Sequence, residues 1–273
     1  MTGKKLKEFY TYLGSVYDEE RFVHISGWGK ARRSFINKLL KKYAQSGVWL
    51  DLGCGGGVFL SEMSKLNTRV VIGADIALPA LMRASAANSQ SDLICCDAEI
   101  LPLSGSSITL LLCSETIEHL EHPELLLSEC ARVLMNNGIL ILTCPNWKKS
   151  RPERVDVGIL RHFGAAEKNY IHTAFQPQEL DEMAAKCGLT ILESGSFEKE
   201  MRIWGRFHDA IGNAVIRLAE AIHFHDGMIR MIYRLQSFTG GLCFEILRIA
   251  GIARLMRGFF RGGPRSFIVA MKK

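Results

Sequence analysis

Five apolar runs, separated by stretches with helical spacing, constrain the fold of this chain most strongly. The runs are VWLDLG (48–53), RVVIGADI (69–76), SDLICCD (91–97), ITLLLCSE (108–115) and GILILTCP (138–145). They are almost continuously apolar rather than alternating, which is typical of parallel strands covered on both faces. Between them, stretches such as PALMRASAA and PELLLSECARVL have helical spacing. This alternation predicts an α/β fold, with a doubly wound, mostly parallel sheet and right-handed crossovers.

Two later runs complete the predicted sheet. LTILESGSF (189–197) predicts a sixth strand and SFIVAMKK (266–273) a last one, so we expect a seven-stranded, Rossmann-like sheet. A length of 273 residues suits one large domain. We therefore expect a single domain over 1–273, with an N-terminal helical cap over 1–46 and a helical, Arg-rich insertion over 198–265 before the last strand.

Composition narrows the class of protein. Hydrophobic residues make up 48% of the chain and charged residues 23%, which favours a folded protein. The first fifteen residues have no apolar signal-peptide core, and no uncharged apolar run reaches the roughly 18 residues that a spanning helix needs. The eight cysteines form no CxxC pair, and most lie inside apolar runs. We expect reduced thiols and a cytoplasmic protein.

The segment VWLDLGCGGGVFL (48–60) predicts a strand, a glycine-rich turn and the start of a helix. Such a turn lets a ligand approach the main chain closely. A nicotinamide dinucleotide site would need a third glycine where Val58 stands. Asp51, just before the turn, is poorly suited to a pyrophosphate but suits an ammonium or sulfonium group. The pattern favours a nucleoside cofactor without phosphates, and an ordinary tight turn between strand and helix is the alternative.

Two further carboxylates follow the next strands. Asp75 ends the second strand, where a carboxylate can accept hydrogen bonds from ribose hydroxyls. Asp97 ends the third strand, where it can meet the edge of an adenine. The carboxyl ends of neighbouring parallel strands converge on one crevice, so we expect Asp51, Asp75 and Asp97 to line one nucleoside site.

On these residues the sequence resembles the class I S-adenosylmethionine-dependent methyltransferases, and within them the small-molecule, ubiquinone-type O-methyltransferases. The resemblance covers roughly residues 10–197 and the last strand. Its motifs are LDLGCGGG, GADI, CDAEILPL, CSETIEHLEHPELLLSECARVL and NNGILILTCPN.

The resemblance implies S-adenosyl-L-methionine as cofactor and a set of residues that bind it. Asp51 would lie near its amino group, Asp75 on the ribose hydroxyls, and Ser114 near the methionine moiety. Tyr17, in a Tyr-Asp pair, would help close the site. Arg32 or Arg33 would meet the cofactor carboxylate, and the sequence leaves that choice open. The remaining implied positions are the Gly53-Cys54-Gly55 turn beside methionine and ribose, Ile76 against the adenine, and Asp97, Ala98 and Glu99 at the adenine edge.

The stretch SETIEHLEHPE (114–124) follows the fourth strand and is rich in acids and histidines. Methyl transfer from a sulfonium is an in-line displacement that requires no metal, and no further ligand cluster supports a metal site. If the acceptor is a hydroxyl, it must lose a proton, and a base helps. His119 is the candidate base, with Glu118 beside it. The alternative is a structural imidazole that bonds backbone or substrate.

The segment Glu200–Arg265 contains ten arginines, five acids and no lysine. Asn213, Arg217 and Glu220 fall on one narrow stripe of a helix that is otherwise largely apolar. This pattern fits helices lying on an anionic membrane surface through 200–263, as in a peripheral membrane protein. It would also fit a lid over a lipid or quinone precursor, or an ordinary helical layer that packs on the domain or forms the interface of a homodimer. The arginines are not interleaved with exposed aromatics, so no nucleic-acid partner is expected.

The sequence thus predicts an S-adenosylmethionine-dependent methyltransferase that acts on a small, apolar or lipid-like acceptor by in-line methyl transfer. Two alternatives belong to other classes. One is a non-catalytic cofactor-binding or scaffold protein on the same fold, and the other is a nicotinamide-dependent reductase.

Overall fold

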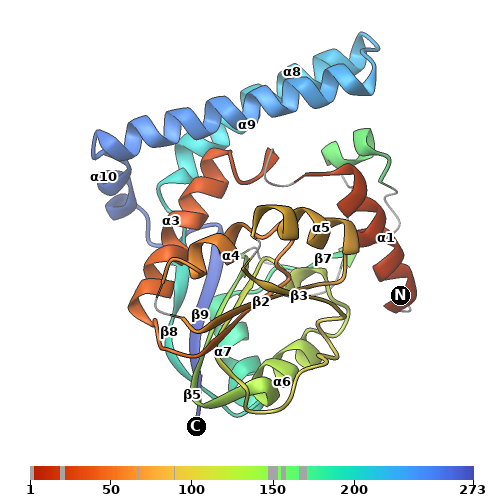
Figure 1. The fold of residues 1–273 in the computed structure, drawn as a ribbon. Helices are drawn as coiled ribbons and strands as arrows, with labels where there is room; N and C mark the ends of the chain where they lie inside the picture. The colour runs from red at the N-terminus through yellow and green to blue at the C-terminus, as the bar shows by residue number, and fades with distance from the viewer. Residues whose placement is uncertain are drawn as a thin grey trace.

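The computed structural model describes residues 3–18, 22–66, 68–88, 90–146, 153–154, 158–165 and 171–273. At its centre is a seven-stranded sheet with strand order β3-β2-β1-β4-β5-β9-β8 (Figure 1). The strands are β1 (Val48–Leu52), β2 (Val70–Asp75), β3 (Asp92–Cys95), β4 (Ile108–Ser114), β5 (Leu134–Pro145), β8 (Leu189–Phe197) and β9 (Arg265–Lys272). The first five pair in parallel, and β9 runs antiparallel to both of its neighbours. The prediction of a doubly wound, mostly parallel seven-stranded sheet is confirmed.

Helices cover both faces of this sheet, which explains the continuous apolar runs. In β4, Leu111 packs into the core on one face, while Leu110 and Leu112 pack into the core on the other. Helices α6 (Pro123–Val133) and α7 (Pro177–Lys186) belong to the first core. The second core contains α3 (Gly27–Lys42), α4 (Val58–Met63) and α5 (Leu78–Ala87).

The sequence did not predict the small features between β5 and α7. Strands β6 (Glu153–Arg154) and β7 (Ile171–His172) form a separate two-stranded sheet, and η2 (Gly158–Phe163) is a short 3-10 helix. Another 3-10 helix, η1 (Ile117–His119), follows β4. Strands of two residues, such as β6 and β7, are too short to show a periodic pattern in the sequence. Much of the intervening stretch lies outside the described residues.

The segment before β9 is helical, as predicted. It forms α8 (Met201–Ala221), α9 (Asp226–Ile249) and α10 (Ile252–Phe259). Figure 1 shows α8 and α9 side by side as a long hairpin across one end of the molecule, with α3 and α1 (Gly3–Val16) between it and the sheet. A Cβ at Gly241 would lie 1.9 Å from the carbonyl oxygen of Ile25, so glycine lets α9 sit directly on the chain that leads into α3. No helix within the described ranges combines the length and apolarity needed to span a bilayer.

Candidate active site

The turn after β1 is held by the neighbouring strand. The backbone amides of Gly53 and Cys54 donate to the carbonyl oxygen of Ala74, at 2.7 and 3.1 Å. Gly53 has a φ of +78°, and a Cβ there would lie 2.0 Å from Oγ1 of Thr116. Only glycine fits this conformation and this contact. The turn therefore presents bare backbone at the carboxyl end of the sheet.

A cavity of about 410 Å³ opens at this turn, and we call it the strand-end cavity. It collects nearly all of the residues predicted for the cofactor and for catalysis. Those that line it are Tyr17, Asp51, Gly53, Cys54, Gly55, Asp75, Ile76, Asp97, Ala98, Ser114, Glu118 and His119. Residues from β1, β2, β4, α1 and the segments that follow β3 and β4 thus face one space, as the convergence of strand ends requires.

Asp51, which is buried, and Asp75, which is half-buried, form an acidic pair in this cavity. Oδ2 of Asp51 is buried without a hydrogen-bond partner among the described residues. Burial, reinforced by the Asp75 carboxylate, raises the pKa of Asp51 to about 8. Asp75 accepts hydrogen bonds from the amides of Gly55 and Ala77, each at 2.8 Å, and burial also raises its pKa. An unpaired buried carboxylate is costly, and a cationic ligand would relieve that cost.

The structure separates Asp97 from its neighbour Glu99. Asp97 lines the cavity, and its Oδ1 accepts the backbone amide of Glu99 at 3.0 Å. The Glu99 side chain is not among the cavity-lining groups, and its carboxylate accepts a hydrogen bond from the backbone of His122. The chain turns after Asp97, so the side chains of Asp97 and Glu99, two positions apart, point to different surroundings.

The structure also distinguishes Arg32 from Arg33. Both lie on α3, which begins after Ser26, whose Oγ accepts the amide of Gly29 at 3.1 Å. Arg32 is 7% exposed and lines the strand-end cavity. Arg33 points outward and donates from Nε to Glu62 at 3.1 Å. Neighbouring residues on a helix point about 100° apart. Arg32 is therefore placed to meet an anionic group in the cavity.

Arg32 belongs to a buried cluster with Glu115, Glu198 and Arg265. Its guanidinium lies 3.6 Å from a carboxylate oxygen of Glu115 and 3.6 Å from one of Glu198. Nε of Arg265 donates to Glu198 at 3.1 Å, and Arg265 also contacts Glu115. Two arginines and two glutamates thus lie together near the ends of β4 and β9, and burial raises the pKa of Glu198 to about 8, which leaves the cluster with surplus positive charge at pH 7.

His119 is partly buried in the wall of the strand-end cavity. Its Nδ1 lies 3.0 Å from the carbonyl oxygen of Ile171, so Nδ1 carries the proton and Nε2 is an acceptor in the neutral ring. Nε2 is 3.9 Å from Oε1 of Glu118. Burial lowers the pKa of His119 to about 4, assisted by His172, whose ring centroid is 5.7 Å away. The imidazole is neutral at pH 7.

Several cavity residues were missed by the sequence analysis. They are Tyr10, Leu13 and Gly14 from α1, together with His24, Arg83, Glu115, Thr116, His172 and Arg265. Arg83 of α5 contacts the carbonyl oxygen of Gly14 and donates to that of Tyr17 at 3.4 Å, which fastens α1 over the site. No local sequence pattern predicts this contact between α5 and α1, because the two helices are far apart in the chain. Glu115 and Thr116 carried a signal, since they directly follow the predicted Ser114.

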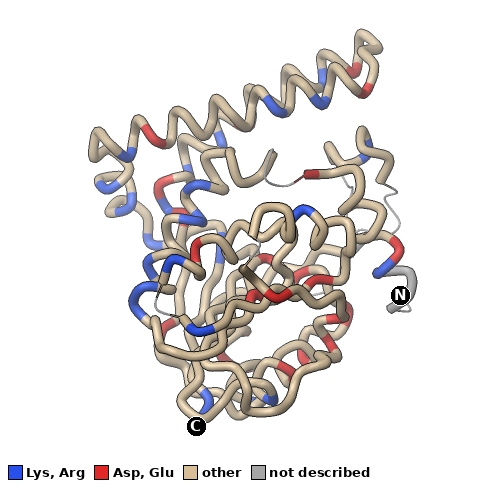
Figure 2. Tube along the Cα trace, viewed as in Figure 1, with Lys and Arg blue, Asp and Glu red and all other residues tan. Residues whose placement is uncertain are grey.

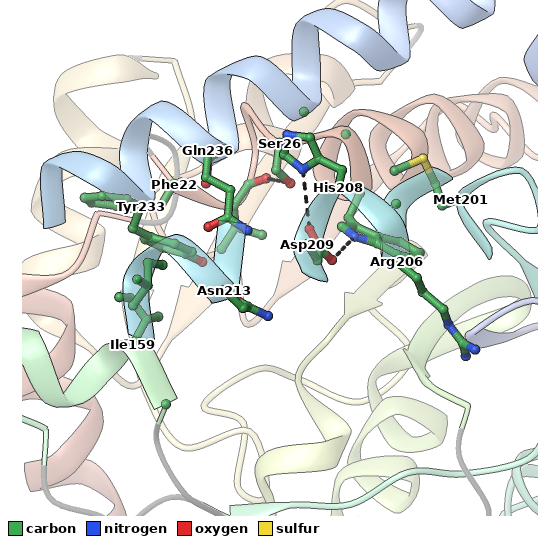
Figure 3. A pocket seen from close by; sticks show the side chains of 18 of the residues that line it. Phe22, Ser26, Ile159, Met201, Arg206, His208, Asp209, Asn213, Tyr233 and Gln236 are labelled. Atoms are coloured by element: carbon green, nitrogen blue, oxygen red, sulfur yellow. Dashed lines mark hydrogen bonds and ion pairs between the residues drawn. The ribbon is translucent and has the colours of Figure 1, made fainter. Parts of the chain in front are cut away.

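A second cavity, of about 720 Å³, lies beneath the hairpin, and we call it the hairpin cavity (Figure 3). Asn213 of α8 and Gln236 of α9 line it, and Phe22 lies on the α9 side, stacked on Tyr233 with ring centroids 5.5 Å apart. Nε1 of Trp28 donates to Asp209 at 2.7 Å on its border. The side chains that line both cavities are Val23, Arg32, Pro145 and Arg265. The two cavities therefore share a wall.

Comparisons with known proteins agree with this geometry. Residues 50–142 match the family model described as "Methyltransferase domain". A ubiquinone biosynthesis O-methyltransferase of Bartonella quintana is 30% identical over 151 residues, which cover 53% of this chain and 60% of that relative. The match thus spans less than two thirds of that protein.

Two solved structures share the fold. A putative sarcosine dimethylglycine methyltransferase from Galdieria sulphuraria is 16% identical, with a TM-score of 0.59 and 98% of each chain covered. The cyclase SpnF is 17% identical, with a TM-score of 0.58, and 90% of this chain and 83% of that one are covered. At these identities the likeness concerns the fold. By sequence, residues 50–142 match a methyltransferase domain, and by fold the whole chain resembles these two solved structures.

Proposed function

We propose that this protein binds S-adenosylmethionine in the strand-end cavity and transfers its methyl group to a small, apolar or lipid-like acceptor. The buried, unpaired Oδ2 of Asp51 beside the bare Gly53 turn is the observation that carries the proposal. A compact cation bound next to this exposed backbone would pair with the Asp51 carboxylate. An ammonium or sulfonium group is such a cation, whereas a pyrophosphate would add negative charge to a site that already holds Asp51 and Asp75.

The residues of the cavity fit the cofactor part by part. Asp51 would neutralise its ammonium group, and Arg32 would pair with its carboxylate. Asp75 keeps unused lone pairs that can accept from ribose hydroxyls, beyond its two backbone bonds. When bound, the cofactor supplies an electrophilic methyl group on sulfur. Tyr17, stacked on Phe22 with ring centroids 5.3 Å apart, closes the outer side and excludes water.

We place the acceptor in the hairpin cavity, which adjoins the strand-end cavity through Arg32 and Arg265. Phe22, Trp28 and Tyr233 on its walls suit the apolar part of such an acceptor, while Asp209, Asn213 and Glu220 of α8 suit its polar groups. An acceptor that reaches across the shared wall would be held in line with the methyl group, and this alignment supplies much of the rate.

For a hydroxyl acceptor, His119 is suited to receive the proton at Nε2, because its Nδ1 is already committed to Ile171. A pKa of about 4 makes it a weak base, so we assign most of the rate to alignment rather than to proton transfer. The name of the Bartonella quintana relative supports testing a phenolic hydroxyl of a ubiquinone precursor first.

The proposal is tested by calorimetry with S-adenosylhomocysteine and NADH, followed by methyl-transfer assays on catechol-type quinone precursors. We expect binding of S-adenosylhomocysteine, no binding of NADH, and turnover of an apolar acceptor. Tight NADH binding would instead indicate a reductase. Tight binding of S-adenosylhomocysteine without turnover on any acceptor would indicate a non-catalytic cofactor-binding protein.

A further inference from the structure

The outer side of the hairpin is apolar along its whole length. On α8 the exposed large apolar residues are Ile203, Phe207, Ile211, Val215, Leu218 and Ile222. On α9 they are Met231, Leu235, Phe238, Leu242, Ile246 and Ile249. Their spacing is three or four residues throughout, so each set forms one continuous stripe along its helix. Leu255 and Phe259 extend the apolar surface onto α10.

These stripes face away from the protein body. On α8 the side chains that line the hairpin cavity include Asp209, Asn213 and Glu220, and on α9 they include Tyr233 and Ser237. At about 100° per residue, the cavity-lining side of each helix lies roughly opposite its apolar stripe. No other described element lies on the outer side of the hairpin (Figure 1). An ordinary surface helix has the reverse arrangement, with its apolar side packed inward.

Charge around this surface is unbalanced. All five acids of the segment are held by groups of the same chain: Glu200 by Arg257, Asp209 by Trp28, Glu220 and Asp226 by His162, and Glu245 by Arg248. Arg234, Arg254 and Arg261 are exposed and form no ion pair within the described ranges. Arg234 lies next to Met231 and Phe238 on the outer side of α9. Figure 2 shows further Lys and Arg at the α10 end of the hairpin and along α3.

We propose that the outer face of α8, α9 and α10 docks on an anionic lipid bilayer. The apolar stripes would lie among the upper acyl chains, with the helix axes in the plane of the interface. The unpaired arginines would reach the headgroups along their aliphatic stems. This surface is the roof of the hairpin cavity, so docking would place the proposed acceptor site directly beneath the membrane surface.

Charge argues for lipid rather than a second copy of the chain. A symmetric dimer through this face would bring two sets of unpaired arginines together while every acid of the segment is already occupied. An anionic bilayer supplies the missing negative charge over the same area as the apolar contact.

The test is co-sedimentation of the full chain with vesicles of equal parts phosphatidylglycerol and phosphatidylcholine, and with phosphatidylcholine alone. We expect binding to the anionic vesicles that weakens as salt is raised. The variant Phe207→Glu/Leu235→Glu alters positions that are 60% and 62% exposed, so it leaves the core intact. We expect it to weaken partitioning at least about tenfold. Met82→Glu, at a position 67% exposed on α5, is the matched control and should bind like the wild type.

The readout requires neither cofactor nor acceptor, so its failure is distinct from failure of the proposed enzymatic function. Circular dichroism spectra and thermal melts like those of the wild type show that the variants are folded. A wild-type protein that stays in the supernatant at every lipid concentration overturns the proposal. So does a double variant that sediments as well as the wild type. Dimerisation in solution that the double variant abolishes, without vesicle binding by the wild type, would assign the face to a second copy.

Discussion

The sheet and the hairpin place their apolar and polar side chains in opposite directions relative to the protein interior. In the sheet, Leu110 and Leu111 are fully buried, and polar groups gather at the strand ends, where Asp51 and Asp75 face the cavity. In the hairpin, polar side chains face a cavity inside the protein, and large apolar side chains face outward. An amphipathic pattern therefore predicts that a segment has two unlike sides. It does not predict which side meets the protein.

The largest expected difference between the regions is the cost of removing an apolar side chain. Leu111→Ala should lower the free energy of unfolding by about 2–5 kcal/mol, because it leaves a void in a packed core. Leu218→Ala, on the exposed stripe of α8, should change it by no more than about 0.5 kcal/mol. Urea unfolding of both variants without lipid checks this. A cost above about 1 kcal/mol for Leu218→Ala would show that the outer face packs against something in the isolated protein.

His24 and His119 in the strand-end cavity should each contribute a loss of stability in acid, opposed by a gain from Asp51, whose pKa is raised. Burial lowers the pKa of both His24 and His119 to about 4, from 6.5 in the unfolded chain. As the pH falls below 6.5, each of these histidines takes up a proton in the unfolded chain but not in the folded protein until about pH 4, so its contribution to stability falls across that window. Between pH 7 and 5 the loss is about 2 kcal/mol for each histidine. Replacing His24 by Asn should remove the loss contributed by His24, which urea unfolding at pH 7 and pH 5 would measure.

Asp51→Asn should weaken cofactor binding and at the same time stabilise the ligand-free protein. We expect the affinity for S-adenosylhomocysteine to fall by about tenfold to a hundredfold, or about 1.4–2.7 kcal/mol, because the ammonium loses its counter-charge. The ligand-free protein should melt at a higher temperature, since the change removes an unpaired buried acid. Calorimetry and thermal melts measure the two effects. Asp209→Asn at the hairpin cavity is the control, and equal losses of affinity for both variants would contradict the assignment.

The affinity for S-adenosylhomocysteine should also depend on pH, through the protonation of Asp51. The pKa of Asp51 is raised to about 8 without ligand, so a cation must displace its proton at lower pH. We expect affinity to rise by up to about tenfold per pH unit from pH 6 toward 8, and to level off there. In Asp51→Asn the rise should vanish. A rise that persists in this variant would assign the titration to another group.

Alanine substitutions at two glycine positions should change the free energy of unfolding in opposite directions. Gly53→Ala should cost about 1–3 kcal/mol in unfolding free energy, because it forces alanine into a positive φ and against Thr116. At Gly258 on α10, a Cβ would meet no atom within 4 Å. Gly258→Ala should therefore stabilise the protein by up to about 1 kcal/mol through helix propensity. Chemical denaturation of both variants tests the pair.

Much of the candidate site could be predicted from the sequence, because its residues lie at the ends of strands. Once the apolar runs are identified as neighbouring parallel strands, Asp51, Asp75 and Asp97 must converge, whatever the packing details. The same reasoning places Ser114 and His119 beside them. Glu99 falls outside the cavity because its orientation depends on one turn after Asp97, and turn geometry is not encoded by periodicity.

The sequence by itself determined the α/β class, the seven strands, the glycine turn and the carboxylates, since each depends on residues close together in the chain. Only the tertiary structure decided that Arg32 rather than Arg33 enters the site, and that α1 covers it. It also decided that Arg265 from the last strand joins Glu115, and that the hairpin presents its apolar side to the outside. These outcomes depend on which surfaces meet across long sequence separations. Local periodicity creates the surfaces, and packing energy summed over the whole domain selects their partners.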